Sequence, residues 1–159
     1  RPGMITKFID VLQDFQGIKR RLDILQLSQD QVVIDDYAHH PEAIKSVHTS
    51  LRQMFPDDEI AVFFQPHLYS RTQQFEDEFA EVLALFDAVY LLPVYPAREE
   101  PIPGITSSNL LQKVQLSNKL IIRKSELVDF VNVSSERIKA ILGAGDIGHL
   151  VEVFKSNRS

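Results

Sequence analysis

Ile60-Ala61-Val62-Phe63-Phe64 is an uninterrupted apolar run, and it decides the fold class that the sequence predicts. Strands without polar alternation are typical of parallel sheets, because helices cover both faces of such a sheet. Ala88-Val89-Tyr90-Leu91-Leu92 is a second run of this kind, a shorter one lies at residues 120–122, and residues 138–142 are apolar except for Lys139. These four segments predict the parallel strands of an α/β domain.

Apolar residues at helical spacing separate the predicted strands. Ile44, Val47, Leu51 and Met54 form one helical face, and Pro41 stands near the first position of that helix, where proline is tolerated. Further helices are expected at residues 5–15, 75–86, 107–114, 125–131 and 147–154. The alternation of strands and helices predicts a three-layer, Rossmann-like α/β domain with a mainly parallel sheet.

Two strands that follow each other closely predict a hairpin near the N-terminus. Residues 21–27 alternate in part, and residues 31–35 contain the β-branched run Val32-Val33-Ile34. Ser28-Gln29-Asp30 between them is a short polar turn. We therefore expect an N-terminal antiparallel hairpin.

The overall composition limits the possible classes of protein. The length of 159 residues suits one domain, which we expect to span residues 1–159. A net charge of −5 argues against a broad nucleic-acid-binding face, and no apolar run reaches the ~20 residues that span a bilayer. The lack of cysteine excludes disulfides and fits a cytoplasmic location. We expect no signal peptide, and the start at Arg1 is compatible with a longer natural polypeptide.

Polar residues follow several of the predicted strands. In open α/β sheets, ligands bind at the carboxyl ends of the strands. The segments that come directly after strands are Asp35-Asp36-Tyr37, Gln65-Pro66-His67, Pro93-Val94-Tyr95 and Gly143-Ala144-Gly145-Asp146. We expect these segments to meet at one edge of the sheet and to form the functional site there.

Asp35-Asp36-Tyr37-Ala38-His39-His40-Pro41 is the segment richest in titratable groups. Such a loop favours a functional role, because carboxylates and imidazoles gather where they bind ligands or transfer protons. One alternative is structural: Asp35 or Asp36 caps the helix that follows. Another is a metal-dependent hydrolase that uses Asp35, Asp36, His39 and His67.

His67 and Arg71 lie between a buried strand and the start of a helix. An arginine in that position can bind a carboxylate or phosphate with two parallel hydrogen bonds. The alternative is a surface Arg71 paired with Glu76 or Glu78.

Two further motifs carry weaker predictions. Residues 17–23 place three cations before a strand, which by itself indicates a solvated turn. Residues 143–148 match G-x-G-x-x-G, but no βαβ unit and no ribose-binding acid follow them, so we expect a tight strand-to-helix turn rather than a dinucleotide site.

Five motifs, taken together and in this order, resemble the Mur ligases. They are Phe15-Gln16-Gly17 with Arg20-Arg21-Leu22-Asp23, then residues 35–41, then Phe64-Gln65-Pro66-His67 with Tyr69-Ser70-Arg71-Thr72, then Val94-Tyr95-Pro96-Ala97 with Pro101-Ile102-Pro103-Gly104, and Gly143-Ala144-Gly145-Asp146-Ile147.

The resemblance implies a three-domain enzyme with a UDP-sugar domain, a central ATPase domain and a C-terminal Rossmann-like domain. This chain resembles the C-terminal domain alone, which accounts for the lack of a P-loop motif. Within the family, its motifs are most similar to those of the branch that joins L-alanine to UDP-N-acetylmuramate in peptidoglycan precursor synthesis. The implied partners are these two substrates and the central domain of the same polypeptide, with no nucleic acid and no membrane. ATP and Mg²⁺ would be held mainly by the central domain and would support an acyl-phosphate intermediate, so the domain alone is expected to be inactive.

The resemblance also implies roles for single residues. Arg21, Asp36 and Tyr37 match positions that contact the nucleotide. His39, His67 and Arg71 match positions near the amino acid and the product, with Arg71 on the amino-acid carboxylate. No residue is assigned as catalytic or as a metal ligand. The chain departs from some relatives at two positions, since Leu68 replaces an arginine and Arg98 a glycine.

Two alternatives remain beside this interpretation. A related ligase recycles muropeptides by adding a whole tripeptide to the same sugar, but there we expect Glu-Pro-Arg-Ser in place of Gln65-Pro66-His67-Leu68. The other alternative is a stand-alone module that binds a nucleotide or a small anion.

Overall fold

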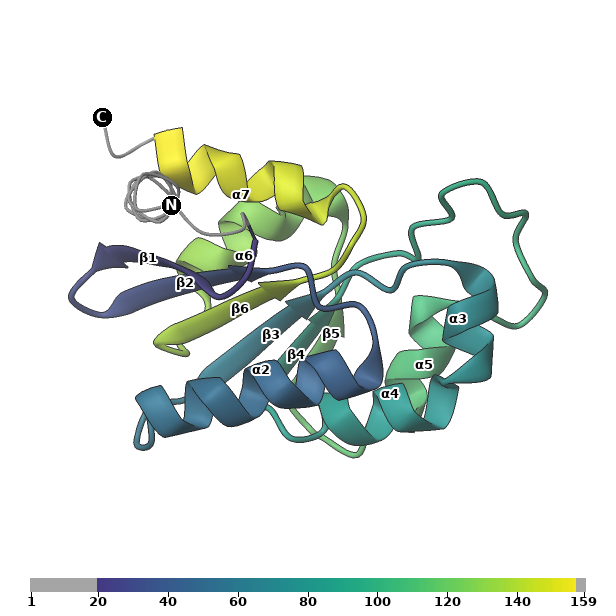
Figure 1. Ribbon diagram of the computed structural model, residues 1–159, viewed down its shortest axis with the longest axis horizontal. Coiled ribbons are helices and arrows are strands. Elements are labelled where there is room, and N and C mark those ends of the chain that lie inside the picture. Colours follow the sequence, from purple (N-terminus) through teal and green to yellow (C-terminus); the bar gives the residue numbers. More distant parts are fainter. Residues whose placement is uncertain (1–19, 157–159) are drawn as a thin grey trace, which may run out of the picture.

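A computed structural model describes residues 20–156 of the chain. The helix expected at residues 5–15 lies outside this range. A six-stranded sheet forms the middle layer, with the strand order β1-β2-β6-β3-β4-β5 (Figure 1). Its strands are β1 (Asp23–Ser28), β2 (Gln31–Asp36), β3 (Ile60–Phe64), β4 (Ala88–Leu91), β5 (Lys119–Ile121) and β6 (Ile138–Leu142).

The sheet is parallel except at one edge. β1 pairs with β2 in antiparallel orientation, and β2, β6, β3, β4 and β5 pair in parallel. The expected N-terminal hairpin and the mainly parallel sheet are therefore confirmed. Because the last strand in sequence, β6, lies between β2 and β3, the loops after these three strands are neighbours in space.

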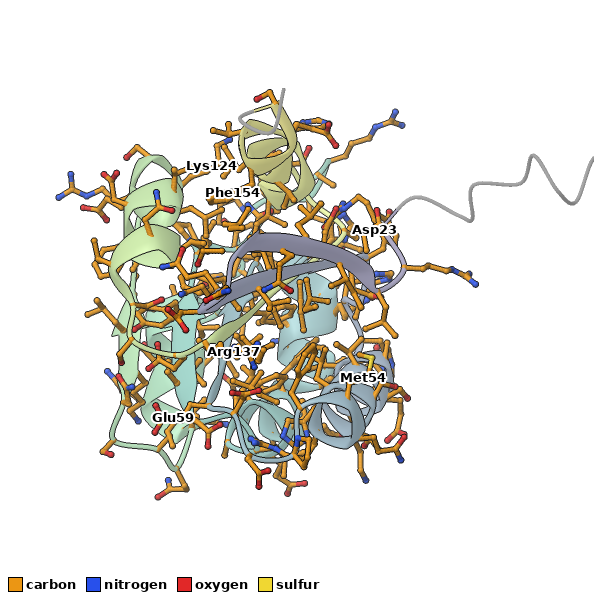
Figure 2. The ribbon with its side chains drawn as sticks, turned by 90° about the vertical axis from the view of Figure 1, so that its left-hand side faces the viewer. Asp23, Met54, Glu59, Lys124, Arg137 and Phe154 are labelled. Carbon is orange, nitrogen blue, oxygen red and sulfur yellow. The ribbon has the colours of Figure 1, made fainter. Side chains whose placement is uncertain are left out.

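Helices cover both faces of the sheet, as in a three-layer α/β domain. One face carries α2 (Pro41–Met54), α4 (Glu76–Leu83) and α5 (Ser107–Lys113), with α3 (Tyr69–Gln74) leading into α4. The other face carries α7 (Ile147–Ser156) and α6 (Leu127–Val133), which a short 3₁₀ turn, η1 (Lys124–Glu126), precedes. Met54 on α2 and Phe154 on α7 mark the two opposite sides of the sheet (Figure 2).

Two cores result from the alternation of side chains along the strands. On β3, Val62 and Phe64 point into the core under α2 and α4, whereas Ala61 and Phe63 point into the core under α6 and α7. All five residues of β3 are buried, which explains why this strand shows no polar alternation.

The helix predicted at residues 75–86 is wrong in its bounds. The structure has two helices that meet at Phe75, and α4 ends at Leu83, so that Phe86 follows the helix. Phe79, Val82 and Phe86 are nevertheless buried, so the apolar pattern identified core residues correctly.

Among residues 20–156, no helix has the length and apolar character needed to cross a membrane.

Candidate functional site

The carboxyl ends of neighbouring strands bring the polar loops together. The Gly143 amide donates to the Asp36 carbonyl (3.3 Å), and the Gln65 amide donates to the Leu142 carbonyl (3.1 Å). Beyond β3 and β4, His67 and Tyr95 form an isolated parallel bridge. The four segments expected at one edge of the sheet therefore do meet there.

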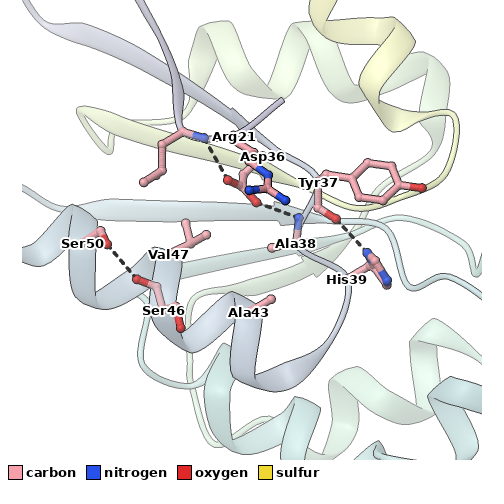
Figure 3. A pocket seen from close by; sticks show the side chains of 10 residues that line it. Arg21, Asp36, Tyr37, Ala38, His39, Ala43, Ser46, Val47 and Ser50 are labelled. Atoms are coloured by element: carbon pink, nitrogen blue, oxygen red, sulfur yellow. Dashed lines mark hydrogen bonds between the residues drawn. The ribbon is translucent and has the colours of Figure 1, made fainter. Parts of the chain in front are cut away.

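A pocket of about 510 Å³ opens beside the loop after β2. The segment that enters β1, this loop and one face of α2 line it (Figure 3). Four residues that the sequence singled out are among its walls, namely Arg21, Asp36, Tyr37 and His39. Tyr37 is 49% exposed, so its ring is available to a ligand.

Asp36 organises the wall of this pocket. Its Oδ2 accepts a hydrogen bond from the Leu22 amide (2.8 Å), and its Oδ1 accepts one from the Ala38 amide (2.7 Å). The alternative that an aspartate caps α2 is wrong, because His40 occupies the cap position and makes no side-chain cap bond. Asp36 instead joins the entry of β1 to the loop after β2. Each of its oxygens can still accept a second hydrogen bond.

Asp35 is fully buried and does not line the pocket. Arg20 pairs with it, with 3.0 Å between Nε and Oδ1. The same guanidinium donates from Nη2 to the Gly143 carbonyl (2.7 Å) and lies 5.3 Å from the centre of the Tyr37 ring. The interpretation of this segment as a merely solvated turn is therefore wrong for Arg20, which is half-buried and connects three segments behind the pocket.

The arrangement does not favour the metal-dependent hydrolase. Asp35, one of its four proposed ligands, is engaged with Arg20 inside the protein. Within residues 20–156, no three His, Cys, Asp or Glu side chains meet in a way that could hold a metal ion.

His39, His67 and Arg71 form a second group next to the pocket. The rings of His39 and His67 are 6.0 Å apart, and the ring of Tyr95 stacks on His67 at 5.6 Å. Arg71 donates from Nη1 to His67 Nδ1 (3.2 Å) and to the His67 carbonyl (3.4 Å). The alternative that pairs Arg71 with Glu76 or Glu78 is not supported, because Glu76 binds Lys113 and Arg71 faces His67.

The hydrogen bonds set the donor and acceptor roles of the two histidines. Because Arg71 can only donate, neutral His67 accepts at Nδ1 and keeps its proton on Nε2. His39 Nδ1 donates to the Tyr37 carbonyl (2.8 Å), so its Nε2 is an acceptor in the neutral ring. Burial, with the charge of Arg71 next, lowers the pKa of His67 below 6.5 and favours the neutral form. The group thus offers donors at Arg71 and His67 and an acceptor at His39.

The Gly143–Gly148 turn is a packing element. Gly143 has φ 145°, and a Cβ there would come 2.9 Å from the Gln65 carbonyl oxygen. The buried Gln65 side chain donates to Asp146 (2.8 Å) and accepts from the Ile147 amide (3.0 Å). Burial opposes ionisation of Asp146, but hydrogen bonds from Lys124 and Gln65 outweigh it and lower its pKa. The expected tight strand-to-helix turn is confirmed.

A comparison with protein families agrees with the resemblance of the sequence motifs to the Mur ligases. The model described as "Mur ligase, glutamate ligase domain" matches residues 20–151, which is most of the chain. The chain belongs to the Mur ligase family.

Among the curated Mur ligases, the UDP-N-acetylmuramate–L-alanine ligase of Christiangramia forsetii is 45% identical over 144 residues. The match covers 91% of this chain but 32% of the relative, so the chain spans about a third of the relative's length.

Solved structures of Mur ligases share the fold. UDP-N-acetylmuramate-alanine ligase from Thermotoga maritima matches with a TM-score of 0.66 and 27% identity, over 94% of this chain and 32% of that one. A domain from a putative UDP-N-acetylmuramate:L-alanyl-γ-D-glutamyl-meso-diaminopimelate ligase of Haemophilus ducreyi matches with a TM-score of 0.60 and 21% identity. The match covers 87% of this chain and 100% of that chain, so that structure holds a domain of this fold without the rest of its ligase.

Sequence reasoning missed three members of the site. Arg20 was indistinguishable from its cationic neighbours, although it is the one that reaches Asp35. Tyr95 stood at a predicted strand end but had no assigned role, and Glu99 stood in a long loop with no signal at all. Glu99 becomes recognisable only in three dimensions, where it contacts Ser70.

Proposed function

We propose that this chain is the C-terminal domain of an ATP-dependent ligase that joins L-alanine to UDP-N-acetylmuramate. The observation that carries the proposal is the 45% identity to an enzyme of that name over 91% of the chain. The adjacency of the pocket and of the group around His67 supports it, since the reaction needs a nucleotide and an amino acid side by side. The rest of the enzyme would lie elsewhere in a longer polypeptide of the bacterial cytoplasm.

Arg21, Asp36 and Tyr37 would form the nucleotide side. The spare acceptor positions of Asp36 suit the two hydroxyl donors of a ribose. The exposed ring of Tyr37 suits stacking with a base, and Arg21 adds a positive charge to the same pocket.

His39, His67 and Arg71 would form the amino-acid side. The Arg71 fork and the Nε2 proton of His67 suit the carboxylate of L-alanine, and Nε2 of His39 suits its ammonium. A neutral His67 also avoids placing another cation beside that ammonium.

ATP would supply the phosphoryl group that activates the muramoyl carboxylate, and Mg²⁺ would neutralise the charge that develops. The donor set described above suits a ribose and a base better than a triphosphate with its metal. We therefore assign the phosphates and Mg²⁺ to the rest of the longer enzyme, and closure of this domain would bring the amino acid to them.

The full-length enzyme tests the proposal directly. It should release ADP only when UDP-N-acetylmuramate and L-alanine are both present, and the isolated chain should release none. ADP release with the tripeptide in place of L-alanine would favour the recycling ligase instead. Micromolar ATP binding by the isolated chain in calorimetry would favour the stand-alone module.

A further inference from the structure

The long loop between β4 and α5 is fastened to α3 by Glu99. The Glu99 carboxylate accepts hydrogen bonds from the Ser70 amide (2.9 Å) and the Ser70 hydroxyl (2.5 Å), and a further backbone bond involves Tyr69. These amides belong to the first turn of the helix, whose N–H groups have no partner inside the helix. A residue 29 positions away therefore completes the start of α3.

The start of α3 needs this support. Leu68, which precedes the helix, has φ 73°, a value that residues other than glycine rarely adopt, and it makes no side-chain cap bond. The same loop holds this residue from the other side, since the Leu68 amide donates to the Tyr95 carbonyl (2.9 Å) and the Tyr95 amide donates to the Pro66 carbonyl (2.8 Å).

Arg71 lies in the turn that Glu99 completes. Its guanidinium reaches back by one helical turn to His67, and the ring of His67 lies against Tyr95 of the fastened loop. Movement of the first turn of α3 would therefore move Arg71 relative to His67. Glu99 also brings a negative charge close to both of them.

We propose that Glu99 is a positioning residue for the amino-acid side of the site, which fixes the direction of the Arg71 guanidinium by completing the first turn of α3. This inference rests on the proposed function, because it takes Arg71 to bind the carboxylate of L-alanine. Glu99 does not itself touch the substrate. Its hydrogen bonds with Ser70 lower its pKa, so it is charged at neutral pH and partly balances the charge of Arg71.

Glu99→Gln tests the inference, and Glu100→Gln is its matched control. Both variants remove one negative charge from adjacent positions of the same loop, but Glu100 is exposed and makes no hydrogen bond or ion pair with residues 20–156. In the full-length enzyme, Glu99→Gln should raise the KM for L-alanine roughly tenfold and leave the KM for ATP nearly unchanged. Glu100→Gln should change neither. An equal rise in both variants, or an unchanged alanine KM in Glu99→Gln, would overturn the inference.

A measurement on the isolated chain separates this inference from the proposed function. In NMR spectra, Glu99→Gln should shift the Ser70 amide resonance and lower the pKa of His67 further, because the carboxylate that favours its protonated form is gone. Spectra in which both signals equal those of Glu100→Gln would overturn the positioning role. If both signals move but the full-length wild-type enzyme does not use L-alanine, the proposed function fails while the contact between Glu99 and α3 stands.

Discussion

Arg20 and Asp35 form an ion pair behind the pocket, with the carboxylate fully buried and the arginine side chain 19% exposed. The pair connects three segments that are far apart in the sequence. Arg20 belongs to the entry of β1, Asp35 to the end of β2, and the Gly143 carbonyl, which the same guanidinium binds, to the turn after β6. The guanidinium also fills the space that a side chain at Gly148 would need, since a Cβ at Gly148 would come 2.2 Å from the guanidinium carbon of Arg20.

Replacement of Arg20 should destabilise the domain strongly. In Arg20→Met the buried carboxylate of Asp35 loses its cation, and we expect the free energy of unfolding in urea to fall by about 2–4 kcal/mol. Arg20→Met/Asp35→Asn removes both charges and should recover part of this loss. If the double variant is no more stable than the single one, the pair does not account for the effect.

Two glycines with positive φ should differ in their tolerance of alanine. Gly104 has φ 82° in open space, so Gly104→Ala should cost roughly 1 kcal/mol from backbone strain alone. Gly143 has φ 145°, and its new Cβ would also meet the Gln65 backbone, so Gly143→Ala should cost roughly 3 kcal/mol. Thermal unfolding of the two variants compares these costs. Equal losses would contradict the packing role of the Gly143 turn.

The sequence predicted the sheet well because the buried strands are apolar on both faces. β3 shows this most clearly, and the rule that ligands bind at strand ends predicts from the sequence that Asp36, His67 and Tyr95 lie at one edge. The roles within that edge were less predictable. Arg20 and Arg21 are neighbours of the same type, yet Arg20 is half-buried behind the pocket and Arg21 lines it, in a segment where Arg20 and Leu22 both have positive φ values. The contact of Glu99 with Ser70 spans 29 residues and follows no local pattern.

His48 should make the domain less stable in mild acid. Burial, with the charge of Arg52 next, lowers the pKa of His48 below 6.5, and its ring packs on Phe86. The unfolded chain therefore binds the proton more readily, and stability should fall as the pH drops through 6.5 toward the folded pKa. His48→Gln should reduce this slope in urea unfolding between about pH 7 and 5. His149→Gln, on the exposed side of α7, is the control and should keep the wild-type slope.

Arg71 should be needed for the amino acid more than for the nucleotide. In the full-length enzyme, Arg71→Ala should raise the KM for L-alanine by roughly tenfold or more, because it removes the guanidinium that would donate to the amino-acid carboxylate. Arg71→Lys keeps the charge but loses the fork and should give an intermediate value. Arg123→Ala removes an equal charge from a side chain that is 84% exposed and should behave as wild type. Unchanged alanine kinetics in Arg71→Ala would refute the role.

Tyr37 should act through its ring and not through its hydroxyl group. The guanidinium carbon of Arg20 lies 5.3 Å from the centre of this ring, and the ring of His39 meets it edge-on with 5.2 Å between the centres. Both neighbours therefore contact the ring and not the phenol oxygen. In the full-length enzyme, Tyr37→Ala should raise the KM for ATP roughly tenfold, because a base would lose its stacking partner. Tyr37→Phe keeps the ring and should stay close to wild type in ATP kinetics. A rise in the ATP KM of Tyr37→Phe equal to that of Tyr37→Ala would show instead that the hydroxyl group binds the nucleotide.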